Sequence, residues 1–157
     1  MERKINNPFI NELNKCFGCS SANPAGLKLE FTEKDDYVVS VWNPSDNFQG
    51  YPGVLHGGII ATLLDETAAW CVYVKAETAG VTSSMFIRYN HPVYISKGAV
   101  RIEAVLAGRD DKYAEINCRL FDSDNKLCAE ADLKYFIYPP RIAAVRFGYP
   151  GRDKFIQ

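Results

Sequence analysis

One short stretch of the chain places two glycines directly before a strongly apolar segment, as His56-Gly57-Gly58. If a helix begins there, its first backbone N–H groups have no intrahelical partners and carry a partial positive charge. The bare glycine backbone lets another group approach these donors, so the site can hold an anion, including the oxyanion of an attacked carbonyl. The alternative interpretation is a tight turn that simply needs glycine.

Asp65 is the second residue that could take part in a reaction, because it lies inside the same apolar segment. It shares a helical face with Thr62 and Ala69. Asp is a poor residue in the middle of a helix. In apolar surroundings its carboxylate must be paired, or its pKa must rise. The position therefore indicates either a hydrogen bond to a neighbouring loop or a general base or nucleophile. We expect the adjacent Glu66 to be a solvated charge, since it points ~100° away.

The spacing of these residues limits how they can cooperate. Asp65 follows His56 by nine residues, which is roughly 13 Å along a helix. A base and an oxyanion site must both come within ~3 Å of the reacting centre. One straight helix cannot achieve this, whereas two helices that lie antiparallel across a two-fold axis can. If both residues are functional, the sequence predicts a homodimer with two sites at its interface.

The elements that must position these residues follow from hydrophobic periodicity. Apolar residues recur at spacings of three and four over residues 58–75, which predicts one long buried helix. After Gly80 the period changes to two, which is typical of strands. The predicted strands after the helix cover residues 81–90, 99–108, 113–121 and 127–138.

The segments on either side of this core complete the prediction. We expect a short helix at residues 8–15 and a hairpin of strands at 27–31 and 37–42. Consecutive strands around one helix indicate an α+β fold, with six antiparallel strands curled about the helix. We expect one domain over residues 1–138, with an N-terminal helix and loop in residues 1–26. Residues 139–157 form a C-terminal extension, either an edge element or a mobile tail.

Composition excludes several classes of protein. The chain has 157 residues and a formal net charge of −1, without the basic excess that a nucleic-acid binder needs. Its 47% hydrophobic and 24% charged residues are typical of a globular domain. No apolar run reaches the ~18 residues of a membrane span. The polar N-terminus lacks the apolar core of a signal peptide, so we expect a cytoplasmic protein.

The five cysteines include one Cys-x-x-Cys pair, Cys16 and Cys19. The other three lie at spacings that do not complete a zinc site. The two histidines, His56 and His91, and the scattered acidic residues give no ligand set either. We therefore expect no metal, and we expect the paired cysteines to be half-buried thiols that pack a turn.

The segment from His56 to Asp65 resembles the H-G-G-x(6)-D signature of hotdog-fold acyl-CoA thioesterases, in the PaaI-like and THEM-type branch. The resemblance extends over residues 16–137, and the hotdog fold is an antiparallel sheet wrapped around one long central helix. The strand order predicted above agrees with it independently. Three further segments resemble the same branch: Cys16-Phe17-Gly18-Cys19 with Asn23-Pro24-Ala25-Gly26-Leu27, Phe48-Gln49-Gly50-Tyr51-Pro52-Gly53, and Tyr89-Asn90-His91-Pro92, in which His91 stands where Arg is usual.

This resemblance implies hydrolysis of an acyl-CoA, or a related acyl thioester, to a free acid and a thiol. The backbone N–H of Gly57 or Gly58 would polarise the thioester carbonyl, and Asp65 of the partner chain would act as base or nucleophile. Thr82 would orient the attacking water, although it can also be read as an ordinary strand residue. His56 would orient the motif loop.

The resemblance also implies substrate contacts and partners. Gln49 and His91 would contact the substrate, beside His56, and coenzyme A would enter only as part of that substrate, with no further cofactor. A homodimer would pair into a dimer of dimers, a homotetramer. Two alternatives stay open: a non-catalytic acyl-CoA-binding or sensing module, and a hotdog hydratase or dehydratase. The acyl group itself depends on Trp70, Tyr73, Phe86 and loop positions.

Overall fold

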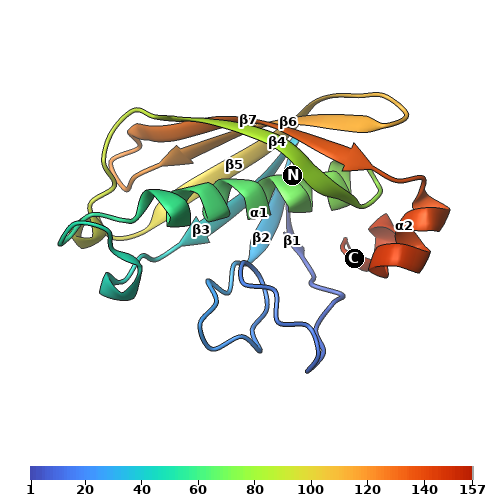
Figure 1. The fold of residues 1–157 in the computed structure, drawn as a ribbon, viewed down its shortest axis with the longest axis horizontal. Coiled ribbons are helices and arrows are strands. Elements are labelled where there is room, and N and C mark those ends of the chain that lie inside the picture. The colour runs from blue at the N-terminus through green and yellow to red at the C-terminus, as the bar shows by residue number, and fades with distance from the viewer. Residues whose placement is uncertain (157) are drawn as a thin grey trace.

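A long helix lies across the concave face of one curved sheet (Figure 1). The computed structural model describes residues 1–156. Helix α1 spans Gly57–Lys75, within one residue of the predicted start and at the predicted end. Its buried side chains include Ile60, Leu63, Leu64 and Thr67. They repeat at the three- and four-residue spacing that indicated a buried helix, so this prediction is confirmed.

Within residues 1–156 the strands form one seven-stranded sheet in the order β1-β2-β3-β5-β6-β7-β4, and every neighbouring pair is antiparallel. The order confirms the hotdog arrangement of an α+β protein, with one strand more than expected. The strands are β1 Glu2–Ile5, β2 Phe31–Lys34, β3 Tyr37–Trp42, β4 Gly80–Tyr89, β5 Val100–Arg109, β6 Tyr113–Phe121 and β7 Leu127–Ile137.

The predicted helix at residues 8–15 is wrong, because this segment forms a series of turns. The side chain of Asn7 accepts a hydrogen bond from the backbone N–H of Phe9, at 2.9 Å. Asn11 does the same for Leu13 and Asn14. Such side-chain bonds offer the backbone an alternative to helical hydrogen bonds, and they explain why apolar residues at helical spacing did not produce a helix.

The first strand of the predicted hairpin lies later in the chain than expected. Strand β2 begins at Phe31, whereas the prediction ended there. Lys28 has a φ of 54°, which interrupts extended backbone. Leu27 and Leu29 are nevertheless buried. The backbone N–H of Leu27 donates to the carbonyl of Phe17, and that of Leu29 donates to the carbonyl of Gly18, which holds the segment in place. The alternating pattern therefore reflects burial of an irregular segment.

The C-terminal extension packs against the end of α1 (Figure 1). It contains helix α2, Pro140–Phe147, and a 3₁₀ turn at Arg152–Lys154. Phe155 is fully buried, and its ring stacks on Tyr73 with the centroids 5.4 Å apart. The sequence left open whether this extension is a structured element or a mobile tail. Its described part is a structured element that packs against the rest of the fold. The expected extension ends at residue 157, which lies outside the described residues.

Among the helices of residues 1–156, none has the length and hydrophobicity needed to cross a bilayer.

Candidate functional site

Hydroxyl groups from two adjacent strands hold the carboxylate of Asp65. Thr82 Oγ1 on β4 donates to Asp65 Oδ1 at 2.8 Å, and the Tyr135 hydroxyl on β7 lies 2.7 Å from the same oxygen. Tyr135 also lies 2.8 Å from the Asp65 backbone carbonyl. In the described part of the chain, Oδ2 has no hydrogen-bond partner. Of the two alternatives, the mid-helix carboxylate is therefore paired, through one oxygen only, and its partners lie on strands and not on a loop.

The pairing of β4 with β7 brings the two hydroxyls together. Thr82 and Tyr135 are direct partners in the antiparallel register, which shifts immediately afterwards, between Thr82 and Ser84. Burial raises the pKa of the Tyr135 hydroxyl well above its ordinary value, and the negative charge of Asp65 adds to this shift. Tyr135 therefore stays protonated and remains a donor.

Sequence reasoning missed Tyr135. Alternate residues of β7 are buried, and Tyr135 is one of them, at 1% exposure. This period of two could have placed its side chain inward. Only the register of the sheet shows that it lies beside Asp65, 70 residues earlier in the chain.

The start of α1 distinguishes the two glycines. His56 is the N-cap of the helix, and its Nδ1 accepts the backbone N–H of Gly58 at 2.8 Å. A Cβ on Gly58 would lie 3.1 Å from that nitrogen, so glycine allows the imidazole to fold back over the helix end. The N–H of Gly57 has no hydrogen-bond partner within residues 1–156. Gly57 therefore supplies the donor that is free to bind a ligand.

Tyr89 at the end of β4 supports the same turn. Its hydroxyl donates to the carbonyl of Gly57 at 2.9 Å, and a Cβ on Gly57 would lie 3.6 Å from its ring. This is an ordinary van der Waals distance. The position of the Gly57 N–H is thus set by the helix on one side and by the edge strand on the other.

Gln49 lies beside the helix start. It lines a hollow together with His56, Gly58 and Ile59, while its Oε1 accepts the backbone N–H of Gly53 at 3.2 Å. His56 is exposed and also lines a second hollow with Gly57. The structure therefore brings Gln49, His56 and the two glycines together at one end of α1.

His91 is not part of this group within one chain. It is exposed in the segment after β4, and its backbone N–H bonds to the carbonyl of Cys128 at 3.1 Å. No hydrogen bond in the described residues joins its imidazole to Asp65 or to the start of α1.

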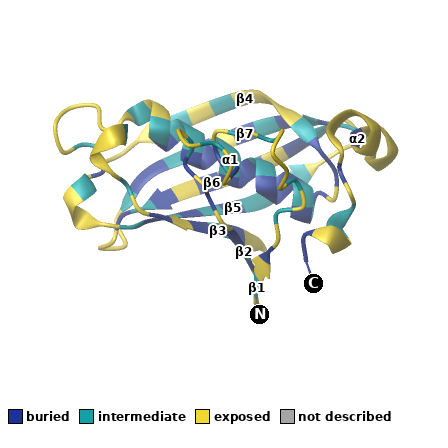
Figure 2. Ribbon diagram, turned by 90° about the horizontal axis from the view of Figure 1, so that it is seen from below, coloured by how far each residue is buried: buried dark blue, intermediate teal, exposed yellow. Residues whose placement is uncertain are grey.

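The two halves of the candidate site are separated along one helix. Asp65 follows Gly57 by eight residues, which is roughly 12 Å of helix. Strand β4, which carries Thr82, is the last strand of the sheet and leaves one edge unpaired in the described chain. Figure 2 shows β4 as largely exposed, and its apolar side chains Phe86 and Tyr89 are 60% and 53% exposed.

Of the residues proposed to set acyl specificity, Trp70 belongs to the core and Tyr73 is partly buried against it. Trp70 is 1% exposed and stacks on Phe31, and Tyr73 packs against Phe155. Phe86, in contrast, is on the exposed edge strand. Of these three side chains, Phe86 is therefore the one that is largely exposed.

The expectation that Glu66 is a solvated charge is wrong. The Trp70 indole donates to its Oε1 at 3.2 Å, and the N-terminal segment covers it from the other side, where Cys16 Sγ lies 3.5 Å from the same oxygen. This burial raises the pKa of Glu66 to about 7. The error arises because periodicity describes the helix alone and cannot show that a distant loop folds over it.

Comparison with known proteins places these features in context. Residues 52–129 match the model of the family described as "Thioesterase superfamily". The rat acyl-coenzyme A thioesterase THEM4 is 27% identical over 105 residues, which are 64% of this chain and 44% of that protein. The chain thus spans less than half the length of this relative.

Two solved structures share the fold. A hypothetical thioesterase protein from Streptococcus pneumoniae, crystallised with coenzyme A, is 20% identical with a TM-score of 0.65, over 71% of this chain and 90% of that one. The Escherichia coli PaaI protein is 16% identical with a TM-score of 0.66, over 73% of this chain and 82% of that one.

Proposed function

Because this chain is a hotdog-fold member of the thioesterase superfamily, of the PaaI and THEM type, we propose that it is a thioester hydrolase acting on an acyl-CoA. The observation that carries the proposal is the arrangement around Asp65. Two hydroxyl donors occupy Oδ1 and leave Oδ2 as a base whose orientation is fixed. The coenzyme A bound to the S. pneumoniae protein supports the substrate class.

In the proposed reaction, Asp65 Oδ2 removes a proton from a water molecule as that water attacks the thioester carbonyl. The free N–H of Gly57 donates to the carbonyl oxygen as negative charge develops on it. Collapse of the tetrahedral intermediate breaks the C–S bond, and the thiolate of coenzyme A takes up a proton as it leaves. Thr82 lies beside the base and orients both the carboxylate and the water. The products are a free acid and a thiol.

We also propose that the site is shared between two chains. Asp65 and Gly57 of one chain are too far apart to reach one carbonyl, whereas Gly57 of a second, antiparallel helix can approach Asp65. Pairing of two β4 strands would extend the sheet and cover an edge that is costly to leave open. Association of two dimers into a tetramer rests on the family resemblance alone, as do the substrate contacts of Gln49 and His91. A cytoplasmic location, and thioester hydrolysis without a further cofactor, stay predictions.

Thiol release from a panel of acyl-CoA substrates, with short, long and aromatic acyl groups, tests the activity. The test compares the wild type with Asp65→Asn, and with Asp111→Asn as a control in which an exposed carboxylate of a turn is changed in the same way. We expect turnover of at least one substrate by the wild type and the control, and loss of turnover in Asp65→Asn. Saturable binding of acyl-CoA without any thiol release by the wild type would instead favour the non-catalytic binding module.

A further inference from the structure

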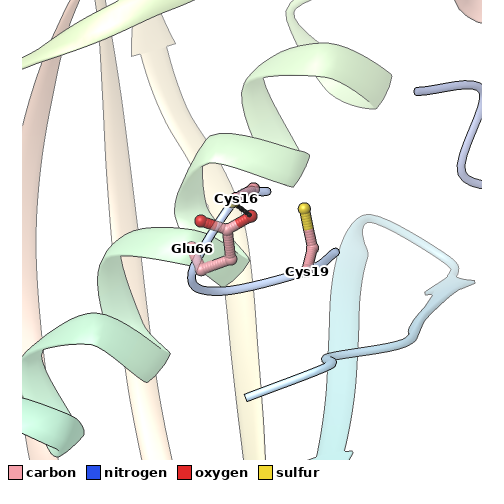
Figure 3. A group of neighbouring side chains, drawn as sticks. All are labelled: Cys16, Cys19 and Glu66. Carbon is pink, nitrogen blue, oxygen red and sulfur yellow. Dashed lines mark hydrogen bonds between the residues drawn. The ribbon is translucent and has the colours of Figure 1, made fainter. Parts of the chain in front are cut away.

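A second group of reactive side chains, which includes neither Asp65 nor the hydroxyls that hold it, joins the N-terminal segment to α1. Figure 3 shows this group. Glu66 projects from α1 toward the loop that carries Cys16 and Cys19. One oxygen of Glu66 and the two sulfur atoms all lie within 4.8 Å of one another. The proposed hydrolysis does not use any of these three side chains.

The distances in this group fit a metal-ion site. Tetrahedral zinc binds thiolate sulfur at ~2.3 Å and carboxylate oxygen at ~2.0 Å, which places these two ligand atoms ~3.5 Å apart. Cys16 Sγ and Glu66 Oε1 are separated by 3.5 Å. The same geometry requires ~3.8 Å between two sulfurs. The sulfur atoms of Cys16 and Cys19 lie within 4.8 Å of each other, which is compatible with this separation.

The loop is shaped to bring the carboxylate this close. A Cβ on Gly18 would lie only 2.5 Å from Glu66 Cδ, so no other residue fits there without moving Glu66. The carbonyls of Phe17 and Gly18 accept backbone hydrogen bonds of 2.8 and 2.9 Å from residues 27 and 29, which fix the loop in place. Trp70 donates to Glu66 Oε1 and orients it, as an outer hydrogen-bond partner does for a metal ligand.

The charges of the group also favour a cation. No Lys or Arg forms a salt bridge with Glu66 in the described part of the chain. Two thiols and one carboxyl group therefore face one another without a basic side chain paired to the carboxylate. A divalent cation could replace the protons that these groups now hold or share.

We propose that Cys16, Cys19 and Glu66 form a binding site for a thiophilic divalent metal ion of the Zn²⁺ type. Two thiolates and one carboxylate supply three ligands, and water supplies the fourth. Binding releases the remaining thiol and carboxyl protons to solvent and involves no change of oxidation state. The ion ties the loop of residues 16–19 to the middle of α1. The site stands independently of thioester hydrolysis.

Cobalt titration tests this site directly. The reduced, chelator-treated protein is titrated with Co²⁺, and thiolate-to-cobalt charge-transfer absorption is recorded before Zn²⁺ is added as a competitor. We expect one equivalent of Co²⁺ to bind and Zn²⁺ to displace it. Cys16→Ser and Cys19→Ser should each abolish or strongly reduce the absorption. Glu66→Gln should weaken affinity by more than the ~10-fold that loss of an outer partner costs.

Cys128→Ser is the matched control, because it removes a buried thiol elsewhere in the fold and should leave the titration unchanged. Circular dichroism confirms that each variant is folded, and the melting temperature of the wild type should rise with Zn²⁺ concentration. Absence of thiolate absorption in the wild type, or an equal signal in the Cys16→Ser/Cys19→Ser double variant, overturns the proposal. The proposal is also overturned if the protein is isolated with Cys16 and Cys19 joined in a disulfide and takes up no metal once that disulfide is reduced.

Discussion

The hydroxyl of Tyr135 and the carboxylate of Asp65 meet at 2.7 Å, although 70 residues separate them in the chain. Tyr135 is buried in β7, whereas Asp65 lies on α1. The contact ties the helix to the sheet at the point where the base would act. Together with Thr82 it occupies Oδ1, which leaves Oδ2 free in a fixed orientation. This relationship gives Asp65 both a structural anchor and a free acceptor.

Asp65→Asn should reduce kcat by at least ~10²-fold, the low end of a general-base contribution. The fold should survive, because an amide is easier to bury than a carboxylate. Thr82→Ala should cost less, since water can replace a hydroxyl that only orients. Steady-state hydrolysis at saturating acyl-CoA checks both. A larger defect in Thr82→Ala would mean that the two roles are assigned the wrong way round.

Tyr135→Phe should lower kcat by less than Asp65→Asn and leave KM nearly unchanged, because the phenol positions the base and contacts no substrate in our proposal. Loss of a buried donor should also destabilise the fold by roughly 1–3 kcal/mol. Urea unfolding and steady-state kinetics measure the two effects. Phe136→Leu, a neighbouring change in an aromatic side chain, is the control for altered packing of β7. A change confined to KM would contradict a positioning role.

Gly58→Ala should destabilise the protein more than Gly57→Ala. The new Cβ at position 58 would lie 3.1 Å from His56 Nδ1, so the imidazole must shift by a few tenths of an ångström and its capping hydrogen bond is weakened, whereas at position 57 the Cβ meets Tyr89 at an ordinary 3.6 Å. Loss of an N-cap costs about 1 kcal/mol. Urea unfolding of the two variants measures the difference. Equal stability would show that the His56 cap contributes little.

Complementation between two inactive variants tests the shared site. Gly57→Pro removes the free N–H at the first helical position, where proline is tolerated, and His56 before it is already extended. Loss of an oxyanion donor should cost ~10²–10³-fold in kcat. When Gly57→Pro and Asp65→Asn chains are refolded together in equal amounts, about one quarter of wild-type activity should return. Half of the dimers are then mixed, and each mixed dimer has one intact site of two. No recovery, with mixed dimers shown by mass spectrometry, would place each site within one chain.

Glu33 should make stability depend on pH in the acidic range. It is 3% exposed. Burial alone raises the pKa of this carboxyl, but hydrogen bonds and charges from Lys75 and Arg152 outweigh burial and hold its pKa below the ordinary 4.5. Because the pKa of Glu33 is lower in the folded protein than in the unfolded chain, its ionised form stabilises the fold at pH values above the unfolded pKa. This contribution is lost as the pH falls through the pKa of the folded protein.

Glu33→Gln removes this titration, so the difference in unfolding free energy between wild type and variant should be largest near neutral pH. It should shrink progressively below about pH 4.5. Urea unfolding across this range measures it, with Glu30→Gln as the control at an exposed partner of Lys4. A difference independent of pH would contradict the assignment.

Features that depend on local pattern could be predicted from the amino-acid sequence. The three- and four-residue spacing predicted α1 within one residue, and the alternation after Gly80 predicted β4 to β7, because burying one face imposes the period of the element. The same pattern singled out Asp65, since a carboxylate is out of place in an apolar helix. Where side chains compete with the backbone, as Asn7 and Asn11 do, the pattern failed.

The groups that meet in the folded protein could not be predicted in this way. Sheet register places Tyr135 on Asp65, and a loop 50 residues away in sequence covers Glu66 and brings Cys16 to it. The cap made by His56 leaves Gly57, and not Gly58, with a free N–H. Such contacts depend on how strands pair and how loops close over a helix. Spacing along one element carries no record of these relationships, because they join residues that are distant in the chain.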